Sequence, residues 1–232
     1  MTRLITALVF AAFTVCAQPD LMTSYAIKKD VALSADPTKP HWKKIKGVQT
    51  TDRFGNPVPG ASHTEIRSIW SPENLYFLFI NKYETQHLKA NPSKTEETWG
   101  IWDYDVSEVF IGEDLNNINL YKEFEVTPQG EWIDLDVVFN KKPQSVDWKW
   151  NSGFKTENRV DTANKIWYCE MQIPWKSIAQ QAIKAGREFR LNLYRIEGSG
   201  EGRKFMAWRP VMNPSFHTPS KFGRLILSAK KN

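Results

Sequence analysis

The sequence predicts an all-β protein, a single-domain β-sandwich of the jelly-roll or immunoglobulin-like kind with one or two short helices. Apolar and polar residues alternate with a period of two along many short segments, which is the pattern of half-buried strands. Clusters of glycine, proline, asparagine and serine separate these segments, and no long stretch has the period of a helix. The chain length of 232 residues is typical of one such domain.

The expected strands follow one another along the chain. Segment 132–139 shows the alternation most clearly, because every second position holds isoleucine, leucine, valine or phenylalanine. Segment 75–80 (LYFLFI) is apolar on both faces, which indicates a central strand. Short helical turns are expected at 40–46 and 174–179, and the glycine-rich segment 198–202 between two strands predicts a hairpin turn. The other expected strands are 65–70, 106–112, 121–127, 154–160, 166–173, 189–195 and 222–227.

Residues 1–17 have the features of a secretory signal peptide. A short basic start is followed by an apolar run and then by a small-residue cleavage site. We therefore expect residues 18–232 to form the mature domain and the protein to be secreted or periplasmic. Lipid anchoring at Cys16 is the alternative, although the residues before it make a poor lipobox. Later apolar runs are too short to span a membrane, and Cys169 shares the phase of core residues on its expected strand.

Composition and motifs argue against several classes of function. The formal net charge is +5, but basic residues occur in pairs such as Lys28-Lys29 that never extend into a run, so we expect no nucleic-acid partner. The four histidines lack metal-site spacing, and the Gly-x-Ser-x-Gly motif of hydrolases does not occur. We therefore predict that the protein is not an enzyme, with no catalytic residues, no metal ligands and no cofactor.

The chain contains ten tryptophans, and several of them lie in polar surroundings. Trp99 and Trp102 occur beside Asp103, Asp105 and Glu108 at the start of an expected strand. The axial C–H groups of a pyranose ring form an apolar patch that stacks on a flat indole, and carboxylates at the rim accept hydrogen bonds from its hydroxyls. These residues predict a carbohydrate site in which Trp102, with Trp99 as the alternate, is the stacking wall.

Arg195 shares the phase of the apolar residues on its expected strand, so its side chain is expected to point into the core. A buried arginine requires a partner, and Glu108 on another strand is a candidate. A plain buried ion pair without a binding role explains the same pattern. Trp148, Trp150 and Trp208 also lie in polar or loop-like segments, and the pattern alone assigns them no role.

Five stretches carry a resemblance to a known family. They are DPTKPHWKK at 36–44, IWSPENLYF at 69–77, WDYDVSEVFI at 102–111, YKEFEVTPQG at 121–130, and segment 208–225 with its Phe-His-x-Pro and Phe-Gly motifs. In this order they resemble the family 9 carbohydrate-binding modules and their family-9-like bacterial relatives. The likeness covers nearly the whole mature chain. It implies a β-sandwich that binds sugars and catalyses no reaction.

The resemblance also implies roles for single residues. In the best-understood members, two tryptophans sandwich a terminal sugar, and acid, amide and arginine side chains bind its hydroxyls. Trp102 matches the tryptophan before the acidic strand, and Trp208 is the expected second wall. Glu108 matches the acidic residue, and Arg195 and Asn192 are the expected arginine and amide. Some relatives bind structural calcium, to which no residues of this chain are assigned.

We therefore expect a secreted, stand-alone, non-catalytic module whose partner is a poly- or oligosaccharide and which associates with glycan-degrading enzymes. An envelope structural or protein-interaction domain, with its tryptophans in the core, is the first alternative. A small glycoside hydrolase with a carboxylate pair is the second. A haem-binding sandwich with Met206 and His217 as ligands is the third.

Overall fold

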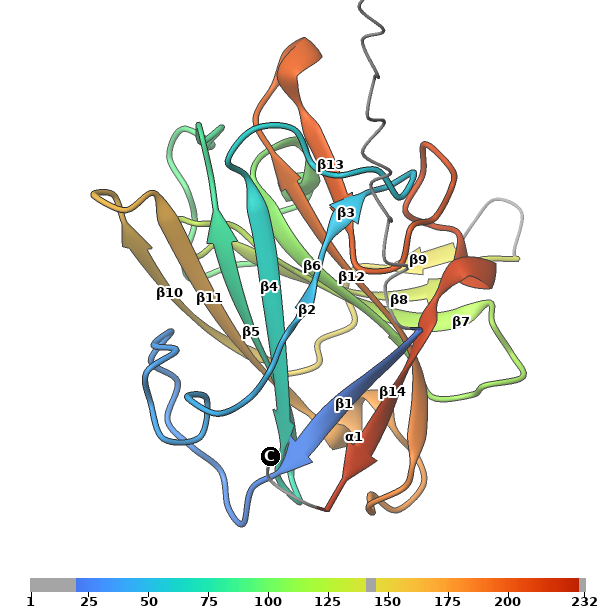
Figure 1. The fold of residues 1–232 in the computed structure, drawn as a ribbon. Coiled ribbons are helices and arrows are strands. Elements are labelled where there is room, and N and C mark those ends of the chain that lie inside the picture. The colour runs from blue at the N-terminus through green and yellow to red at the C-terminus, as the bar shows by residue number, and fades with distance from the viewer. Residues whose placement is uncertain (1–19, 141–144, 230–232) are drawn as a thin grey trace, which may run out of the picture.

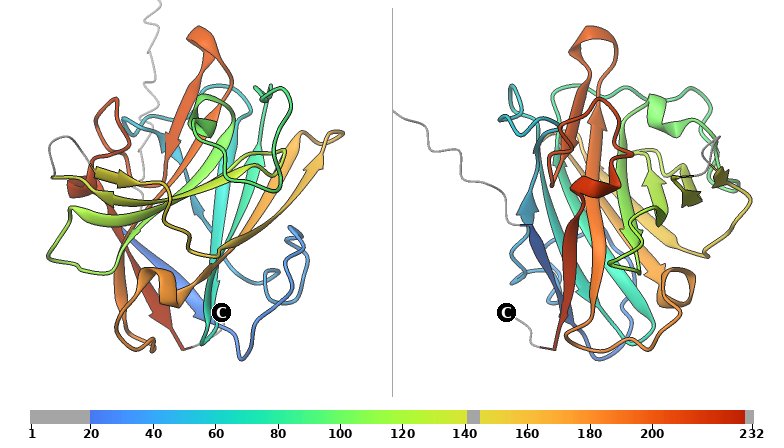
Figure 2. Two further views of the ribbon diagram at one scale, coloured as in Figure 1. Left: turned by 180° about the vertical axis from the view of Figure 1, so that it is seen from behind. Right: turned by 90° about the vertical axis from the view of Figure 1, so that its right-hand side faces the viewer.

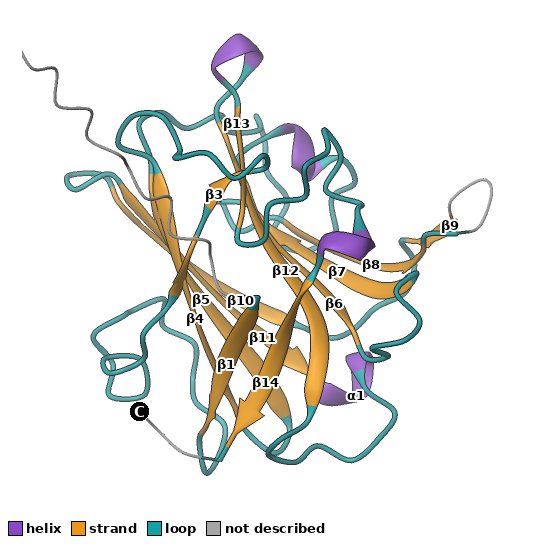
Figure 3. Ribbon diagram, turned by 45° about the vertical axis from the view of Figure 1, so that its right-hand side comes forward, coloured by secondary structure: helices purple, strands orange, loops and turns teal. Residues whose placement is uncertain are grey.

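The computed structural model describes residues 20–140 and 145–229, so the predicted signal peptide lies outside the described residues. The described chain is almost entirely β-structure (Figures 1 and 3). Its longer strands are β1 (Leu21–Ala26), β4 (His63–Trp70), β5 (Asn74–Lys82), β6 (Val106–Gly112), β7 (Leu120–Val126), β8 (Trp132–Val138), β10 (Lys155–Asp161), β11 (Ile166–Pro174), β12 (Glu188–Glu197), β13 (Lys204–Ala207) and β14 (Gly223–Ser228). The shorter elements are β2 (Val48–Gln49), β3 (Thr51–Asp52), β9 (Ser145–Asp147), the helix α1 (Trp175–Ile178) and the 3-10 turns η1 (Ile101–Asp103), η2 (Gly200–Gly202) and η3 (Pro219–Lys221).

The strands form one continuous sheet that curls into two layers, as the rear and side views of Figure 2 show. The order across the sheet is β10-β11-β5-β4-β1-β14-β12-β6-β7-β8-β9. Strand β1 pairs in parallel with β14 over its whole length and with β4 at its end, so it joins the two layers. The first layer is β10-β11-β5-β4, and the second is β14-β12-β6-β7-β8-β9. The predicted all-β sandwich is therefore confirmed.

The main core fills the space between the two layers. Phe77 and Phe79 of β5 face it from the first layer, and Val109, Phe124 and Leu193 face it from the second. All five are fully buried. Side chains alternate between the two faces of a strand, so the neighbours of these residues project outward. Burial of this apolar surface is the main favourable contribution to folding, at roughly 25 cal/mol per Å².

The outer face of the second layer carries a separate apolar cluster. Phe110 of β6, Tyr121 of β7, Leu135 of β8 and Tyr194 of β12 belong to it. They alternate with the residues of the main core, so both faces of this layer are covered. Loops and the β12–β13 hairpin cover this outer face and create the depression in which the candidate site lies.

The segment between β1 and β2 covers the outer face of the first layer. The indole Nε1 of Trp42 donates to the carboxylate of Glu170 on β11 at 3.0 Å, and the backbone N–H groups of Ser34 and Ala35 donate to the same carboxylate at 2.9 and 2.8 Å. These bonds satisfy a fully buried acid. The helical turn expected at 40–46 is present only as hydrogen-bonded turns, in which the Lys43 N–H donates to the Lys39 carbonyl.

Most of the predicted strands are observed within a few residues of their expected bounds, as are the short helix α1 and the hairpin at 198–202. The prediction missed β1 and the very short strands β2, β3 and β9. In the part of the chain that the structure describes, no helix is long and apolar enough to cross a membrane.

Candidate functional site

A cavity of about 360 Å³ opens on the outer face of the second layer. Strands β6 and β7 form its floor, and residues from β8, β12, β13 and the loops beside them form its walls. Its volume is within the usual range for small-ligand sites. The polar lining consists of Glu108, Glu123, Glu125, Arg203 and His217, and the other nine lining residues are apolar, five of them aromatic.

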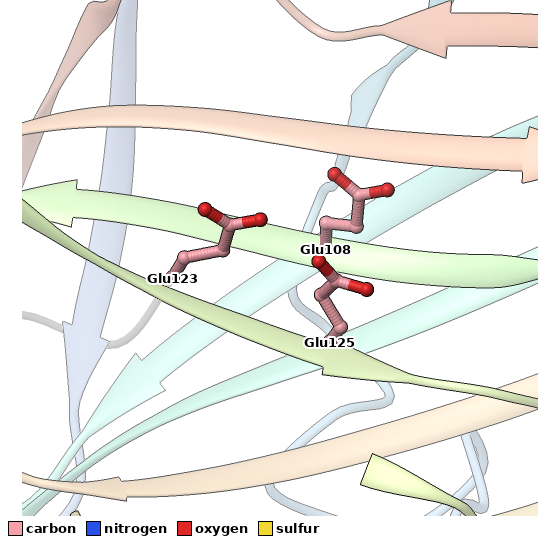
Figure 4. A group of neighbouring side chains, drawn as sticks. All are labelled: Glu108, Glu123 and Glu125. Carbon is pink, nitrogen blue, oxygen red and sulfur yellow. The ribbon is translucent and has the colours of Figure 1, made fainter. Parts of the chain in front are cut away.

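Three glutamates lie together on the floor of the cavity. Glu108 on β6 is directly opposite Glu125 on β7, and Glu123 lies two residues before Glu125 on the same face. The carboxylates project to the same side of the two strands (Figure 4), and one oxygen of each lies within 4.8 Å of the other two. The three residues are only 1–3% exposed. They are also the one group of potential metal ligands found among the described residues.

Burial raises the pKa values of all three carboxyls. The pKa of Glu123 is raised to about 8. The pKa values of Glu108 and Glu125 are raised well above the usual range by burial, and then by the charge of a neighbouring glutamate. Like charges directly opposite each other on adjacent strands destabilise a sheet. A cluster that costs stability in this way is typical of a functional site.

Arg203 supplies the positive charge among the residues that line the cavity. Its Nη2 donates to the backbone carbonyl of Trp102, and its guanidinium lies 4.9 Å from the centre of the Phe205 ring. Its charge favours the ionised form of Glu108 and opposes the effect of burial on that pKa. Arg203 follows η2 at the tip of the β12–β13 hairpin, so it ties this hairpin to the tryptophan-bearing loop.

Three tryptophans gather at the mouth of the cavity. Trp99 is 55% exposed and meets Trp102 edge to face, with ring centres 4.8 Å apart. Trp148 lies against the other side of Trp99, with ring centres 6.0 Å apart, and is 46% exposed. Gly100 between the first two has φ +84°, a conformation that favours glycine, and it leads directly into η1. This turn places the exposed ring of Trp99 and the half-buried ring of Trp102 beside the cavity.

Aromatic residues also line the cavity beyond the tryptophans. Phe216 stacks on Tyr194 with ring centres 4.1 Å apart and meets Phe205 edge to face. His217 Nδ1 is 2.6 Å from the hydroxyl oxygen of Tyr121. Burial lowers the pKa of His217 to about 4, so its imidazole is neutral at pH 7 and adds no charge to the cavity.

The structure brings three of the predicted residues together. Trp99, Trp102 and Glu108 line the same cavity, as the sequence pattern indicated. Asp103 is close in sequence but exposed on η1 and does not line the cavity. Its charge nevertheless contributes to the raised pKa of Glu125.

Asp105 and Arg195 form a buried ion pair away from the cavity lining. Arg195 Nη2 is 3.3 Å from Asp105 Oδ2, and both side chains are fully buried. Asp105 Oδ1 also accepts a hydrogen bond of 2.7 Å from the Gly198 N–H. The suggestion that Glu108 pairs with Arg195 is therefore wrong, because the two residues point to opposite faces of the sheet. The buried position of Arg195 is explained by an ion pair with Asp105 that has no binding role.

Asn192 and Trp208 do not line the cavity either. Trp208 is fully buried in the main core, because it follows β13 with the phase of Met206, opposite to that of Phe205. The expectation that Trp208 is a second wall is therefore corrected, whereas Phe205 and Phe216 do line the cavity. The Asn192 side chain bonds to the Tyr194 hydroxyl at 2.8 Å and to the backbone of residue 209.

The same alternation bears on the haem alternative. Phe205 lines the cavity, so Met206, its neighbour on β13, points to the opposite face and is fully buried. Met206 and His217 are therefore not aimed at a common site. The three carboxylates of the cavity floor are the residues that could hold a cation such as the structural calcium of some relatives, with water completing its coordination shell.

Sequence reasoning missed several lining residues, above all Glu123, Glu125 and Arg203. The glutamates alternate with Phe124 and Val126, which is also the pattern of a strand with an ordinary solvent-facing side. These glutamates could have been found from their position opposite Glu108 on the next strand. That position depends on the pairing register of the two strands, which the sequence alone does not determine.

Comparisons with known proteins identify relatives of this chain. The chain is 31% identical over 139 residues to the UPF0462 protein C4orf33 homolog of Danio rerio, covering 56% of this chain and 63% of that protein. It is 22% identical over 186 residues to endo-1,4-beta-xylanase A of Thermotoga neapolitana, covering 80% of this chain. The chain spans only 16% of that enzyme's length. It therefore covers less than two thirds of the length of each of these two relatives.

Two solved structures share the fold. One is a putative carbohydrate-binding protein from Bacteroides uniformis, with a TM-score of 0.68 and 14% identity over 90% of this chain and 99% of that one. The other is a family 9 carbohydrate-binding module from Caldicellulosiruptor kristjanssonii in complex with cellotriose, with a TM-score of 0.60 and 12% identity over 91% and 96% of the two chains. The family model described as "Carbohydrate family 9 binding domain-like" matches residues 36–230, so the chain belongs to that family.

Proposed function

We propose that the protein binds carbohydrate, without catalysis, in the cavity lined by Trp99, Trp102 and the three glutamates. The observation that carries this proposal is the pair of solvent-accessible indoles beside buried hydrogen-bonding groups in one open cavity. Membership of the family and the solved complex of a structural relative with cellotriose support it.

The residues of the cavity suit the two kinds of surface on a sugar. The exposed ring of Trp99 and the half-buried ring of Trp102 offer flat faces and edges to the axial C–H groups of a pyranose. The carboxyls of the floor and the Arg203 guanidinium supply acceptors and donors for its hydroxyls. Phe205 and Phe216 also line the cavity. We therefore expect the sugar to lie between the two tryptophans and these two phenylalanines.

We propose in addition that segment 1–17 directs export, so that the domain meets its glycan outside the cytoplasm, where glycan-degrading enzymes are its natural associates. The basic start, the apolar run and the small-residue cleavage site support this. N-terminal sequencing of the protein from secreted and periplasmic fractions tests it. A mature chain that begins at Gln18 is the expected result, whereas a protein that keeps Met1 and stays in the cytoplasm contradicts the proposal.

Calorimetric and tryptophan-fluorescence titrations test sugar binding. The protein is titrated with glucose, cellobiose, xylobiose and the corresponding alditols, and the solutions are then assayed for new reducing ends. We expect saturable binding without release of sugar. Weaker binding of the alditols identifies the reducing end as the part recognised.

The variant Trp102→Ala is expected to lose this binding while its unfolding transition remains cooperative. Trp132→Phe is the matched control, because it also removes one indole. Trp132 belongs to the face of β8 opposite to that of Leu135, which lines the cavity. Equal loss of binding in both variants, or no binding of any sugar by the natural chain, refutes the proposal and favours the envelope interaction domain. Release of sugar favours the hydrolase.

A further inference from the structure

The glutamates on the cavity floor have unmet hydrogen-bonding capacity. Glu108 Oε1, Glu123 Oε2 and Glu125 Oε2 are buried, and none of these oxygens has a hydrogen-bond partner. Each residue is more than nine-tenths buried, and all three side chains line the cavity. Glu125 and Glu123 share one hydrogen bond, but the three oxygens named above remain unpartnered. Buried polar atoms are normally satisfied, so the unpartnered oxygens of the three carboxyls indicate a ligand that donates to them.

The charge of the cavity indicates the nature of that ligand. Of its fourteen lining residues, all within the described part of the chain, three are acids, Arg203 is the single formal cation, and His217 is neutral at pH 7. A neutral sugar can exchange hydrogen bonds with these carboxyls, but it does nothing to stabilise their ionised form in an apolar enclosure that holds one formal cation. A ligand that carries positive charge stabilises that form.

The geometry favours an ammonium group over a metal ion. An ammonium has three N–H donors, and three acceptors each at about 2.8 Å in tetrahedral directions lie about 4.6 Å from one another. One oxygen from each of the three glutamates lies within 4.8 Å of the other two, which is compatible with this spacing. The rest of the lining supplies Trp102, Phe110 and Phe205 rather than further oxygen ligands. Aromatic faces attract organic cations, whereas a Ca²⁺ or Mg²⁺ ion would have to complete its oxygen shell with water in a largely apolar space.

We propose that the ligand of this cavity carries a primary ammonium group held by Glu108, Glu123 and Glu125. This inference rests on the proposed function, and together the two identify the ligand class as an amino sugar with a free amine. Such a sugar presents a pyranose face to the tryptophans and its ammonium group to the three carboxylates. N-acetylation removes the charge and two of the three N–H donors, so the acetylated sugar loses the feature that the floor recognises.

Calorimetric titration of the full mature chain at pH 6.5 with three matched disaccharides tests the inference. They are the β-1,4-linked dimer of glucosamine, its N,N′-diacetyl form and cellobiose, which differ only at the 2-position. We expect the free-amine dimer to bind at least about tenfold more tightly than either of the others, because hydrogen bonds to charged groups are the strongest of those available.

The double variant Glu123→Gln/Glu125→Gln is expected to lose that preference. Glu157→Gln, an exposed acid on β10 outside the cavity lining, is the control and is expected to keep it. Thermal unfolding of each variant shows that it remains folded, and the comparison among the three ligands with the natural chain does not depend on any variant.

The outcomes separate this inference from the proposed function. If cellobiose binds as tightly as the free-amine dimer, recognition of an ammonium group is contradicted, whereas the proposed sugar binding stands. No binding of any of the three overturns both. Saturable binding of Ca²⁺ that disappears in the double variant, without a preference for the amine, shows that the acids hold a metal and overturns the inference.

Discussion

At the scale of single residues, burial separates tryptophans that are available to a ligand from tryptophans that build the fold. Trp99 is 55% exposed at the mouth of the cavity, whereas Trp208 is fully buried between the layers. Both occur in segments that read as polar or loop-like, so the sequence alone did not distinguish them. The difference arises from the phase of β13, which sends Phe205 to the cavity and Trp208 to the core.

Substitutions at these two positions are therefore expected to have opposite effects. Trp99→Ala removes an exposed ring, so its free energy of unfolding changes by about 0.5 kcal/mol or less, while sugar binding weakens. Trp208→Ala leaves a cavity in a packed core and lowers the free energy of unfolding by about 3–5 kcal/mol. Chemical denaturation and sugar titration of both variants measure the two effects. A large loss of stability in Trp99→Ala contradicts its assignment to the binding surface.

At the scale of elements, the buried pair of Asp105 and Arg195 fixes the start of β6 against the β12–β13 hairpin. The carboxylate of Asp105 accepts from the Arg195 guanidinium and from the Gly198 N–H, so it joins two segments distant in sequence. The tip of this hairpin carries Arg203, which reaches across to the carbonyl of Trp102. The pair therefore positions cavity residues without lining the cavity itself.

Asp105→Asn is expected to lower the free energy of unfolding by about 3–5 kcal/mol, because it leaves the arginine without a charged partner in the core. Asp103→Asn changes an exposed acid two residues earlier and is expected to leave stability within about 0.5 kcal/mol of the natural chain. Urea denaturation of both variants makes the comparison. Equal stability of the two variants contradicts the structural role of Asp105.

The strands were predictable because their patterns are local. Period-two alternation gives β8 and β11, a continuous apolar run gives β5, and turn signals bound the strands, since these patterns depend only on neighbouring residues. The site was predictable only in part. Trp99, Trp102 and Glu108 are close in sequence, whereas Glu123 and Arg203 join them through strand pairing and a hairpin. Alternation on β7 predicts that its glutamates share a face, but it does not show that a cavity covers that face.

At the scale of the whole molecule, folding places the three acids and His217 in one enclosed space on the outer face of the second layer, so folding is linked to pH. The pKa of Glu123 is raised from 4.5 to about 8 in the folded protein. Between these values the folded state keeps a proton that the unfolded state releases. This contribution to stability is therefore fully present below pH 4.5 and is lost as the pH rises through about 8. Burial raises the pKa of Glu97 to about 7, which acts in the same direction.

His217 acts in the opposite direction over a lower range of pH. Burial lowers its pKa from 6.5 to about 4, so the folded state binds less proton than the unfolded state between these values, and stability rises with pH there. Above pH 6.5 this contribution is constant. The effect of the raised carboxyl pKa values is then unopposed by the histidine.

The free energy of unfolding of the ligand-free protein is therefore expected to fall between pH 6.5 and pH 9. Each group that titrates over this range contributes a slope of at most about 1.4 kcal/mol per pH unit. The variant Glu123→Gln has no proton to lose at this position, so its free energy of unfolding is expected to fall less steeply with pH. The free energy of unfolding of Glu157→Gln is expected to fall with the same slope as that of the natural chain. Denaturation at four pH values measures the three profiles. A flat profile for the natural chain means that the carboxyls of the floor titrate alike in the folded and unfolded states, and it contradicts the raised pKa values that burial under the loops and the hairpin imposes.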